Sequence, residues 1–319
     1  MKIGLFTDSL QDLSFPEAVN WVADHGIEAV ELGTGNFSNA PHCNLELLLT
    51  DAESRAKLLG ELKARGLILS ALNCNGNVLD PDPARRNKAQ QTFFKTIELA
   101  NLLGVDTIVT MSGCPGEAGG NFPNWITCNW QREFPQLLER QWSEEVEPFW
   151  QKAARTIKDR GVKIAIEMHP GQIVYNTRTL LRLRQIVGTS LGANFDPSHL
   201  FWQGMDPMAV IRALGKGAIF HVHAKDTKIN PHEMALNGGL ETLLSGQIGD
   251  RSWDFRTVGY GHGEDWWRDF LSAVRMAGYD GVLSIEHEDR LMGSREGIIK
   301  SVEFLKRITL ETTAEDWLP

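Results

Sequence analysis

Short apolar segments rich in β-branched residues alternate with longer amphipathic segments along the whole chain. The short segments have the length and composition of buried β-strands, and the longer ones repeat their apolar residues at helical spacing. Eight strands are therefore expected. In chain order they are KIGLFT from residue 2, IEAVELG from 27, LILSALN from 67, VDTIVTMS from 105, VKIAIEMHP from 162, LGANFDP from 191, AIFHVHAKD from 218 and GVLSIEHED from 281.

The amphipathic segments between these strands predict helices, and four strands follow a glycine that is typical of a helix C-terminus: DHGIE, ARGLI, DRGVK and MAGYDG. Helices are expected over residues 15–24, 53–65, 83–103 and 143–160. Regular strand–helix alternation predicts a parallel sheet covered by helices, and eight units favour a closed (β/α)8 TIM barrel. We expect one domain over residues 1–319, with residues 308–319 as a candidate extended tail.

Two segments interrupt the alternation and are expected to be long loops without regular structure. Residues 112–142 follow the fourth strand, and residues 227–264 follow the seventh. Both leave the C-terminal ends of strands, the face on which barrel enzymes build their active sites. Loops of this length indicate lids or binding loops, with insertions or contacts between copies as the alternative.

Composition and charge exclude several classes of protein. Hydrophobic residues make up 42% and charged residues 23% of the chain, as in ordinary globular proteins. The net charge is −9 and no basic run occurs, so no nucleic-acid partner is expected. No apolar run reaches the roughly 18 to 20 residues of a membrane span, no G-x-G-x-x-G follows the first strand and no P-loop occurs. We expect a cytoplasmic protein with four reduced cysteines, no membrane contact and no nucleotide cofactor.

Polar side chains gather at the C-terminal ends of the last four expected strands. In a barrel these ends meet at one face, where unpaired buried carboxylates would repel one another. A divalent cation removes this repulsion because each anion becomes a ligand. The residues are Glu167 and His169 on the fifth strand, Asp196 and His199 on the sixth, His221, His223 and Lys225 on the seventh, and Glu286, His287 and Glu288 on the eighth.

Each of these residues also has an ordinary structural explanation. A single carboxylate at a strand end is often a helix cap, and a single histidine is more often packed in a core than bound to metal. His223 lies nearer the strand end than His221, so it is the preferred ligand, and His221 is expected one layer lower. Lys225 fits a salt bridge to a carboxylate at the rim as well as it fits a substrate contact.

The motifs IAIEMHPG, NFDPSHLFWQG, HVHAKD and LSIEHED resemble those of the xylose-isomerase-like barrel superfamily, in its sugar (or sugar-phosphate) isomerase/epimerase branch. That branch includes ketose 3-epimerases and inosose dehydratases. The resemblance implies one metal held by Glu167, Asp196, His223 and Glu286, and a substrate contact from His199.

The chain departs from the epimerases in one respect, because no arginine follows His223 until Arg251. Lys225 or the following loop could take over that role. The superfamily also contains apurinic endonucleases with additional metal-binding histidines after the earlier strands. Here ELGTGN, ALNCNGN and TMSGCPG at those strand ends contain none, so a DNA-repair function is not expected.

The predicted site suits proton transfer next to a carbonyl group. Its ligands are compatible with one divalent ion, with Mn²⁺ favoured over Mg²⁺, Co²⁺ or Zn²⁺. The metal would polarise the carbonyl of a sugar, and Glu167 and Glu286 would remove and return the α-proton through an enediolate. Return to the same carbon gives epimerisation and return to the neighbouring carbon gives isomerisation. Loss of a β-hydroxyl gives dehydration of an inosose, keto-sugar or keto-glycoside, the alternative reaction.

Aromatic and polar residues near this face are candidates for contact with a neutral sugar or polyol. They are His199, His169, Lys225, Trp202 and Trp125. Two other functions stay open: a metal-dependent phosphodiesterase, and a barrel that binds sugar without catalysis. A homo-oligomer is also compatible with the sequence.

Overall fold

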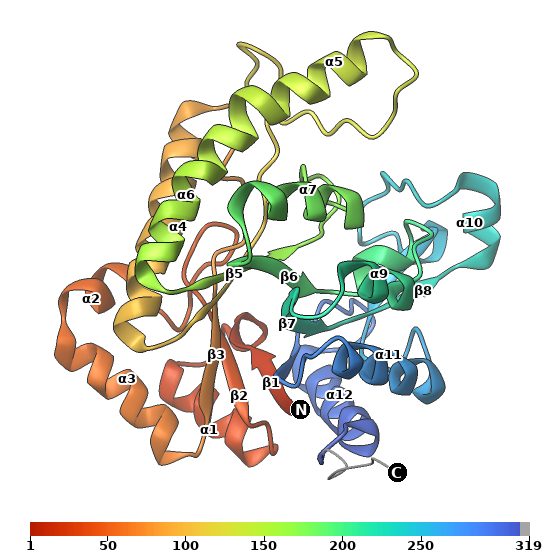
Figure 1. Ribbon diagram of the computed structural model, residues 1–319. Helices are drawn as coiled ribbons and strands as arrows, with labels where there is room; N and C mark the ends of the chain where they lie inside the picture. The colour runs from red at the N-terminus through yellow and green to blue at the C-terminus, as the bar shows by residue number, and fades with distance from the viewer. Residues whose placement is uncertain (313–319) are drawn as a thin grey trace, which may run out of the picture.

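A computed structural model describes residues 1–312. Its centre is a closed barrel of parallel strands in the order β1-β10-β7-β6-β5-β4-β3-β2 (Figure 1). The barrel closes because β1 pairs with β10, with Lys2 opposite Val282. All eight expected strands and the (β/α)8 class are confirmed. The strands are β1 (Lys2–Phe6), β2 (Ala29–Gly33), β3 (Ile68–Asn73), β4 (Thr107–Thr110), β5 (Lys163–Glu167), β6 (Leu191–Phe195), β7 (Ile219–Ala224) and β10 (Val282–Ile285).

Helices surround the barrel and cover the outer face of its strands (Figure 1). Two of the expected helices have the expected bounds, α1 and α4, and α4 ends at Gly104 with a positive φ of 70°. The helix expected from residue 143 is α-helical only from Glu147, because a π-helical turn, η2 (Gln141–Val146), precedes it. The helices are α1 (Phe15–Asp24), α2 (Leu45–Thr50), α3 (Ala52–Ala64), α4 (Pro83–Leu103), α5 (Glu133–Arg140), α6 (Glu147–Arg160), α7 (Thr177–Val187), α8 (Ser198–Phe201), α9 (Pro207–Leu214), α10 (Pro231–Asn237), α11 (Glu264–Met276) and α12 (Ser294–Ile308), with short 3₁₀ turns η1 (Thr7–Leu10) and η3 (Ile248–Asp250).

Long connections follow β4 and β7 as expected, but they are not free of regular structure. The segment after β4 ends in α5, which projects from the barrel at the top of Figure 1. The segment after β7 contains a two-stranded antiparallel sheet of β8 (Asp226–Ile229) and β9 (Trp253–Arg256), with α10 between them. Their many turn residues hid these elements at the level of the sequence.

The core is apolar between the barrel and the helices and polar inside the C-terminal end of the barrel. Trp150 and Trp267 are fully buried beneath the helices, whereas Glu31, Glu167 and His223 are buried within the barrel. No helix in residues 1–312 has the length and apolarity needed to cross a membrane. The candidate tail falls largely on residues 313–319, which lie outside the described residues.

Candidate metal centre and substrate cavity

Three carboxylates converge at the C-terminal end of the barrel. Glu167 is the last residue of β5, Asp196 follows β6 directly and Glu286 follows β10 directly. Parallel strands bring their C-terminal ends together, so residues 119 positions apart become neighbours in space. Glu167 and Asp196 are 1% and 2% exposed, which is unusual for carboxylates without a counter-charge.

His223 lies between two of these carboxylates. Its Nδ1 atom is 3.4 Å from Glu167 Oε2 and 3.3 Å from Glu286 Oε2. Ligand atoms of Glu167, Asp196 and His223 all lie within 4.8 Å of one another. These three residues could therefore contact one ion, and Glu286 lies beside them through His223.

Several polar atoms in this cluster are buried without a hydrogen bond. They include Asp196 Oδ2, His199 Nε2 and His223 Nδ1. Buried polar atoms are nearly always paired, so three orphaned atoms at one point require a partner. Carboxylate oxygens and imidazole nitrogens are the ligands of divalent metals such as Mn²⁺ and Zn²⁺. The residues present therefore fit a metal ion.

Glu31, in the middle of β2, fixes the orientation of His223 from below. Its carboxylate oxygens lie 3.1 and 3.2 Å from His223 Nε2, and Oε2 is 2.9 Å from His221 Nε2. Ser284 Oγ and Asn73 Nδ2 donate to the same carboxylate, each at 2.7 Å. A carboxylate behind a histidine sets its tautomer and leaves the other ring nitrogen free for metal. His221 is thus occupied one layer below His223.

Two asparagines orient Glu167. Asn75 Nδ2 donates to Glu167 Oε2 at 3.2 Å, and Asn194 Nδ2 donates to the same oxygen at 3.0 Å. Asn194 lies on β6 directly opposite Glu167 in the parallel register. These bonds hold one oxygen in place, and the other, Oε1, faces His199 Nε2 at 3.2 Å.

Lys225 supplies the positive charge in this cluster. Its Nζ atom lies 2.7 Å from Glu286, 2.8 Å from Glu288 and 3.4 Å from Asp196. Burial would raise the pKa of Glu286, but the Lys225 ammonium and His223 outweigh it and hold that pKa well below its usual range. Burial also opposes the charge on Lys225, yet its carboxylate neighbours raise the Lys225 pKa well above the usual value. Lys225 therefore forms a salt bridge to the rim carboxylates, and its contact with substrate stays a prediction.

His199 and His169 stand beside the carboxylates as neutral side chains. Their rings lie 4.1 Å apart, centre to centre. Burial lowers the pKa of each to about 4, with the charge of the other histidine also lowering that of His169. Both imidazoles are therefore uncharged at neutral pH and can accept as well as donate hydrogen bonds.

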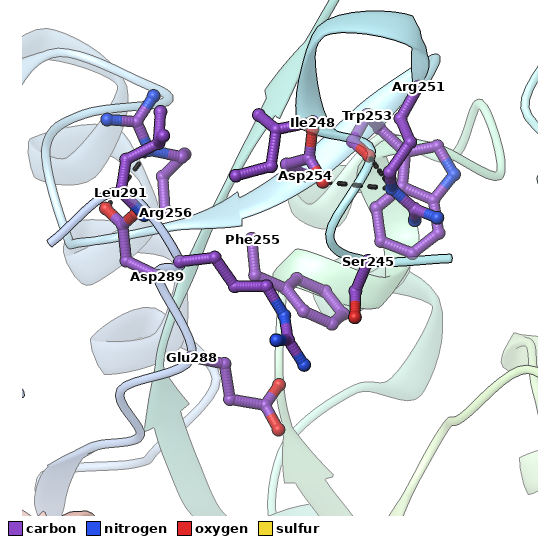
Figure 2. Close-up of a pocket in the computed structure, with 11 residues that line it drawn as sticks. Ser245, Ile248, Arg251, Trp253, Asp254, Phe255, Arg256, Glu288, Asp289 and Leu291 are labelled. Carbon is purple, nitrogen blue, oxygen red and sulfur yellow. Dashed lines mark hydrogen bonds and ion pairs between the residues drawn. The ribbon is translucent and has the colours of Figure 1, made fainter. Parts of the chain in front are cut away.

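The small sheet β8–β9 covers the cluster. The Phe255 ring lies 4.4 Å from Lys225 Nζ and 5.3 Å from the His199 ring. Figure 2 shows this ring between Glu288 and the ion pair of Arg251 with Asp254, around a small pocket of about 70 Å³. Arg251, the first arginine after His223, is thus held in that sheet by Asp254.

The tryptophans predicted to contact substrate lie near the site and pack against other aromatic rings. Trp202 stacks on Trp253 at 4.6 Å with an interplanar angle of 6°, which fastens β9 to the end of α8. Trp125 meets the edge of Tyr175 at 5.3 Å. Their contact with substrate stays a prediction, because neither lines the main cavity beside the cluster.

A cavity of about 430 Å³ opens beside the cluster at the mouth of the barrel. It is lined by Glu286, Asn75 and His169, so it reaches the carboxylate that Lys225 holds and the asparagine that holds Glu167. Asp8 and Glu288 also line it. Its size suits a small molecule.

Sequence reasoning missed Glu31, Asn75, Asn194, Phe255 and Asp8. Glu31 left a visible signal, because a carboxylate inside the buried strand AVELG demands buried partners. The two asparagines and Phe255 left none, since their roles depend on register and on the small sheet.

Asp226, beside Lys225, points away from the carboxylates and anchors a loop. Its Oδ2 accepts hydrogen bonds from the backbone N–H groups of Gly259, Gly261 and His262 at 2.9 to 3.1 Å, and from Trp267 Nε1 at 3.3 Å. A Cβ atom on Gly261 would collide with Asp226 Oδ1 and with the backbone of Thr227, so only glycine fits there. The HVHAKD motif thus serves both the cluster and the fold.

The barrel agrees with the comparison to known proteins. The family model described as "Xylose isomerase-like TIM barrel" matches residues 19–308. The chain belongs to this family.

Individual proteins extend the comparison. Uncharacterized protein YfiH of Bacillus subtilis (strain 168) is 44% identical over 313 residues, which cover 96% of this chain and 99% of YfiH. A crystal structure of IolI protein with a zinc atom has a TM-score of 0.66 at 18% identity and covers 97% of this chain and 98% of IolI. D-psicose 3-epimerase, solved in the presence of D-fructose, has a TM-score of 0.63 at 15% identity and covers 97% and 99%. At these identities the two structures show a shared fold.

Proposed function

We propose that the protein is a divalent-metal-dependent sugar isomerase or epimerase. The observation that carries this proposal is the cluster of Glu167, Asp196 and Glu286 around His223 Nδ1, in which buried ligand atoms have no hydrogen bond within the described residues. Membership of the xylose isomerase-like family supports it, as does the likeness of the fold to D-psicose 3-epimerase.

Glu167, Asp196, His223 and Glu286 would hold the metal, with Glu31 fixing the ring of His223. A bound divalent ion would polarise the carbonyl group of a sugar and stabilise the negative charge that develops on its oxygen. Mn²⁺ is our preferred ion, because the mixed oxygen and nitrogen donors suit it.

Glu167 and Glu286 would move the proton. They approach His223 Nδ1 from two strands, at 3.4 and 3.3 Å, and so flank one point in space. One carboxylate would take the proton from the carbon next to the carbonyl, and the other would return it to the opposite face or to the neighbouring carbon. Asn75 and Asn194 hold one oxygen of Glu167, so a single oxygen is left to face the substrate.

Dehydration ranks second for a physical reason. Loss of a hydroxyl group is assisted by a strong proton donor. His199 and His169 have pKa values lowered to about 4 by burial, so neither is an imidazolium at neutral pH. The neutral rings therefore do not supply such a donor.

Deuterium incorporation from D₂O tests the proposal. The Mn²⁺-loaded protein is incubated with keto-sugars, keto-glycosides and inososes, and incorporation next to the carbonyl is followed by NMR. Glu167→Gln and Glu286→Gln are expected to lower the exchange rate by about 10² to 10⁴ fold. The exposed Glu98→Gln, whose carboxylate pairs with Arg160 on the outer surface, serves as the matched control and is expected to exchange like wild type. Tight metal binding without exchange of any substrate would contradict the proposal.

A further inference from the structure

Asp8 lies at the mouth of the barrel, where η1 (Thr7–Leu10) follows β1. It lines the 430 Å³ cavity that Glu286 and Asn75 also line. Asp8 therefore shares a cavity with the carboxylate cluster while following a different strand, β1.

The carboxyl group of Asp8 has the Ser38 hydroxyl beside it and no other structural task among the described residues. Its Oδ1 atom is buried without a hydrogen bond, and its side chain does not cap η1. By contrast, the Asp82 carboxylate caps α4 by accepting the N–H groups of Ala84 and Arg85. A buried carboxyl oxygen without a partner costs free energy, so stability does not explain Asp8.

The backbone around Asp8 leaves room for this carboxyl group. A Cβ atom on Gly33 would stand 2.7 Å from Asp8 Oδ1 and would also collide with the Ser38 side chain. Glycine at the end of β2 thus permits both side chains to lie at the cavity wall. Burial raises the pKa of Asp8 to about 6; the nearby Ser38 hydroxyl opposes the shift, and the charges of Glu31 and Glu286 add to it.

The charges around the cavity have one sign. Asp8, Glu286 and Glu288 line it, and no lysine or arginine does so within the described residues. Lys225 is already paired with Glu286 and Glu288. A phosphate group in this cavity would meet carboxylates without a free lysine or arginine, whereas a sugar hydroxyl could donate to them.

We propose that Asp8 is a specificity-determining residue that accepts a hydrogen bond from a hydroxyl group of an uncharged keto-sugar or inosose and disfavours phosphorylated sugars. This inference rests on the proposed function, because it takes the cavity beside the cluster as the substrate site. It assigns to Asp8 a contact with substrate at a distance from the reacting carbon, so binding should suffer more than turnover.

Equilibrium binding to the Mn²⁺-loaded protein tests this inference independently of catalysis. The probes are D-fructose, D-psicose, D-tagatose and 2-keto-myo-inositol, with D-fructose 6-phosphate and D-tagatose 6-phosphate as charged partners, measured by calorimetry. Asp8→Asn keeps the size and removes the charge, and Asp8→Ala removes the acceptor. Asp12→Asn, an exposed residue paired with Arg295 on the same segment, is the matched control.

We expect at least one uncharged probe to bind more tightly than the phosphorylated probes. Asp8→Asn and Asp8→Ala should weaken that binding by about 10-fold or more, with Mn²⁺ affinity unchanged. For an exchanging substrate, KM should rise more than kcat falls. Asp8→Asn should also reduce the ratio of the affinity for an uncharged sugar to that for its phosphorylated form, because the Asp8 carboxylate no longer repels the phosphate group.

Three results would overturn the inference: tighter binding of a phosphorylated probe than of its parent, Asp8 variants that bind like Asp12→Asn, or no binding by any uncharged probe. Binding that depends on Asp8 without α-proton exchange would support the inference and contradict the proposed function. If α-proton exchange is lost in Glu167→Gln but unaffected in both Asp8 variants, the proposed function is supported and the inference about Asp8 is contradicted.

Discussion

Glu31 and His223 form a buried pair in which one carboxylate oxygen lies 3.1 Å from Nε2, while Nδ1 on the far side of the ring faces Glu167 and Glu286. The carboxylate comes from β2 and the imidazole from β7, so the pair spans the barrel. Burial would lower the pKa of His223, but Glu31 and Glu286 outweigh it and raise that pKa well above its usual value.

Glu31→Gln is expected to lower metal affinity by about 10 to 100 fold, because an amide no longer enforces the tautomer that leaves Nδ1 free. Titration with Mn²⁺ followed by EPR measures this change. The control is Glu28→Gln, an exposed carboxylate that pairs with Lys2 at the opposite end of the barrel. If Glu31→Gln binds Mn²⁺ with wild-type affinity, the His223 ring does not need the Glu31 carboxylate to hold its orientation.

Lys225→Met should make the stability of the protein depend on metal. The change leaves Glu286 and Asp196 without their positive neighbour, and an uncompensated buried charge costs about 3 to 5 kcal/mol. Mn²⁺ would restore part of this loss by supplying charge. Urea unfolding in the presence of EDTA measures the loss of unfolding free energy, and unfolding in the presence of Mn²⁺ measures how much of it is restored.

The matched control for Lys225→Met is Lys163→Met, which breaks an exposed pair with Asp106. It is expected to cost less than about 1 kcal/mol with or without metal. Equal losses in the two variants would contradict the role assigned to the buried ammonium.

Asp8→Asn should stabilise the protein at pH 8. The pKa of Asp8 is raised from 3.8 to about 6 on folding, so the group contributes stability when protonated, and this contribution is lost as pH rises through about 6. The full shift corresponds to about 3 kcal/mol, and partial exposure of the side chain reduces the expected gain to about 1 to 2 kcal/mol.

Unfolding of Asp8→Asn at pH 8 and at pH 4 measures this difference. The gain should shrink towards zero at the lower pH, where wild-type Asp8 is protonated in the folded state and increasingly so in the unfolded state. Asp12→Asn loses its pair with Arg295 and should show no gain at pH 8. A gain of equal size at both pH values would reject the electrostatic explanation.

Asp226→Ala should destabilise the protein by about 3 kcal/mol or more. It removes the acceptor for three partly buried backbone N–H groups and for the buried Trp267 indole, which lose their partner. The comparison is Asp206→Ala, which removes a helix cap with one N–H bond and should cost about 1 kcal/mol. Thermal unfolding distinguishes the two, and equal losses would contradict this account of Asp226.

Much of the fold could be predicted because its signals are local. Each barrel strand is a short apolar run, and glycines after the helices mark the return to the sheet, as Gly161 does between α6 and β5. The sequence could not show the sheet of β8 and β9, because its two strands are separated by residues rich in glycine and polar side chains. Their pairing depends on contacts with Trp202 and Lys225, which no local pattern encodes.

The candidate site was predictable only for residues at strand ends. Glu167, Asp196, His223 and Glu286 could be grouped because parallel strands of a barrel end on one face. Asn75 and Asp8 follow strands as well, but short polar residues after a strand are also ordinary turn residues. Their roles follow from the shape of the cavity, which arises from the packing of several loops.

Lys225 and Asp226 are consecutive residues whose side chains serve different parts of the structure. Lys225 pairs with Glu286 in the carboxylate cluster, and Asp226 accepts hydrogen bonds from the loop at residues 259–262. Two consecutive residues therefore set both the charge balance at the centre of the barrel and the anchorage of a loop outside it.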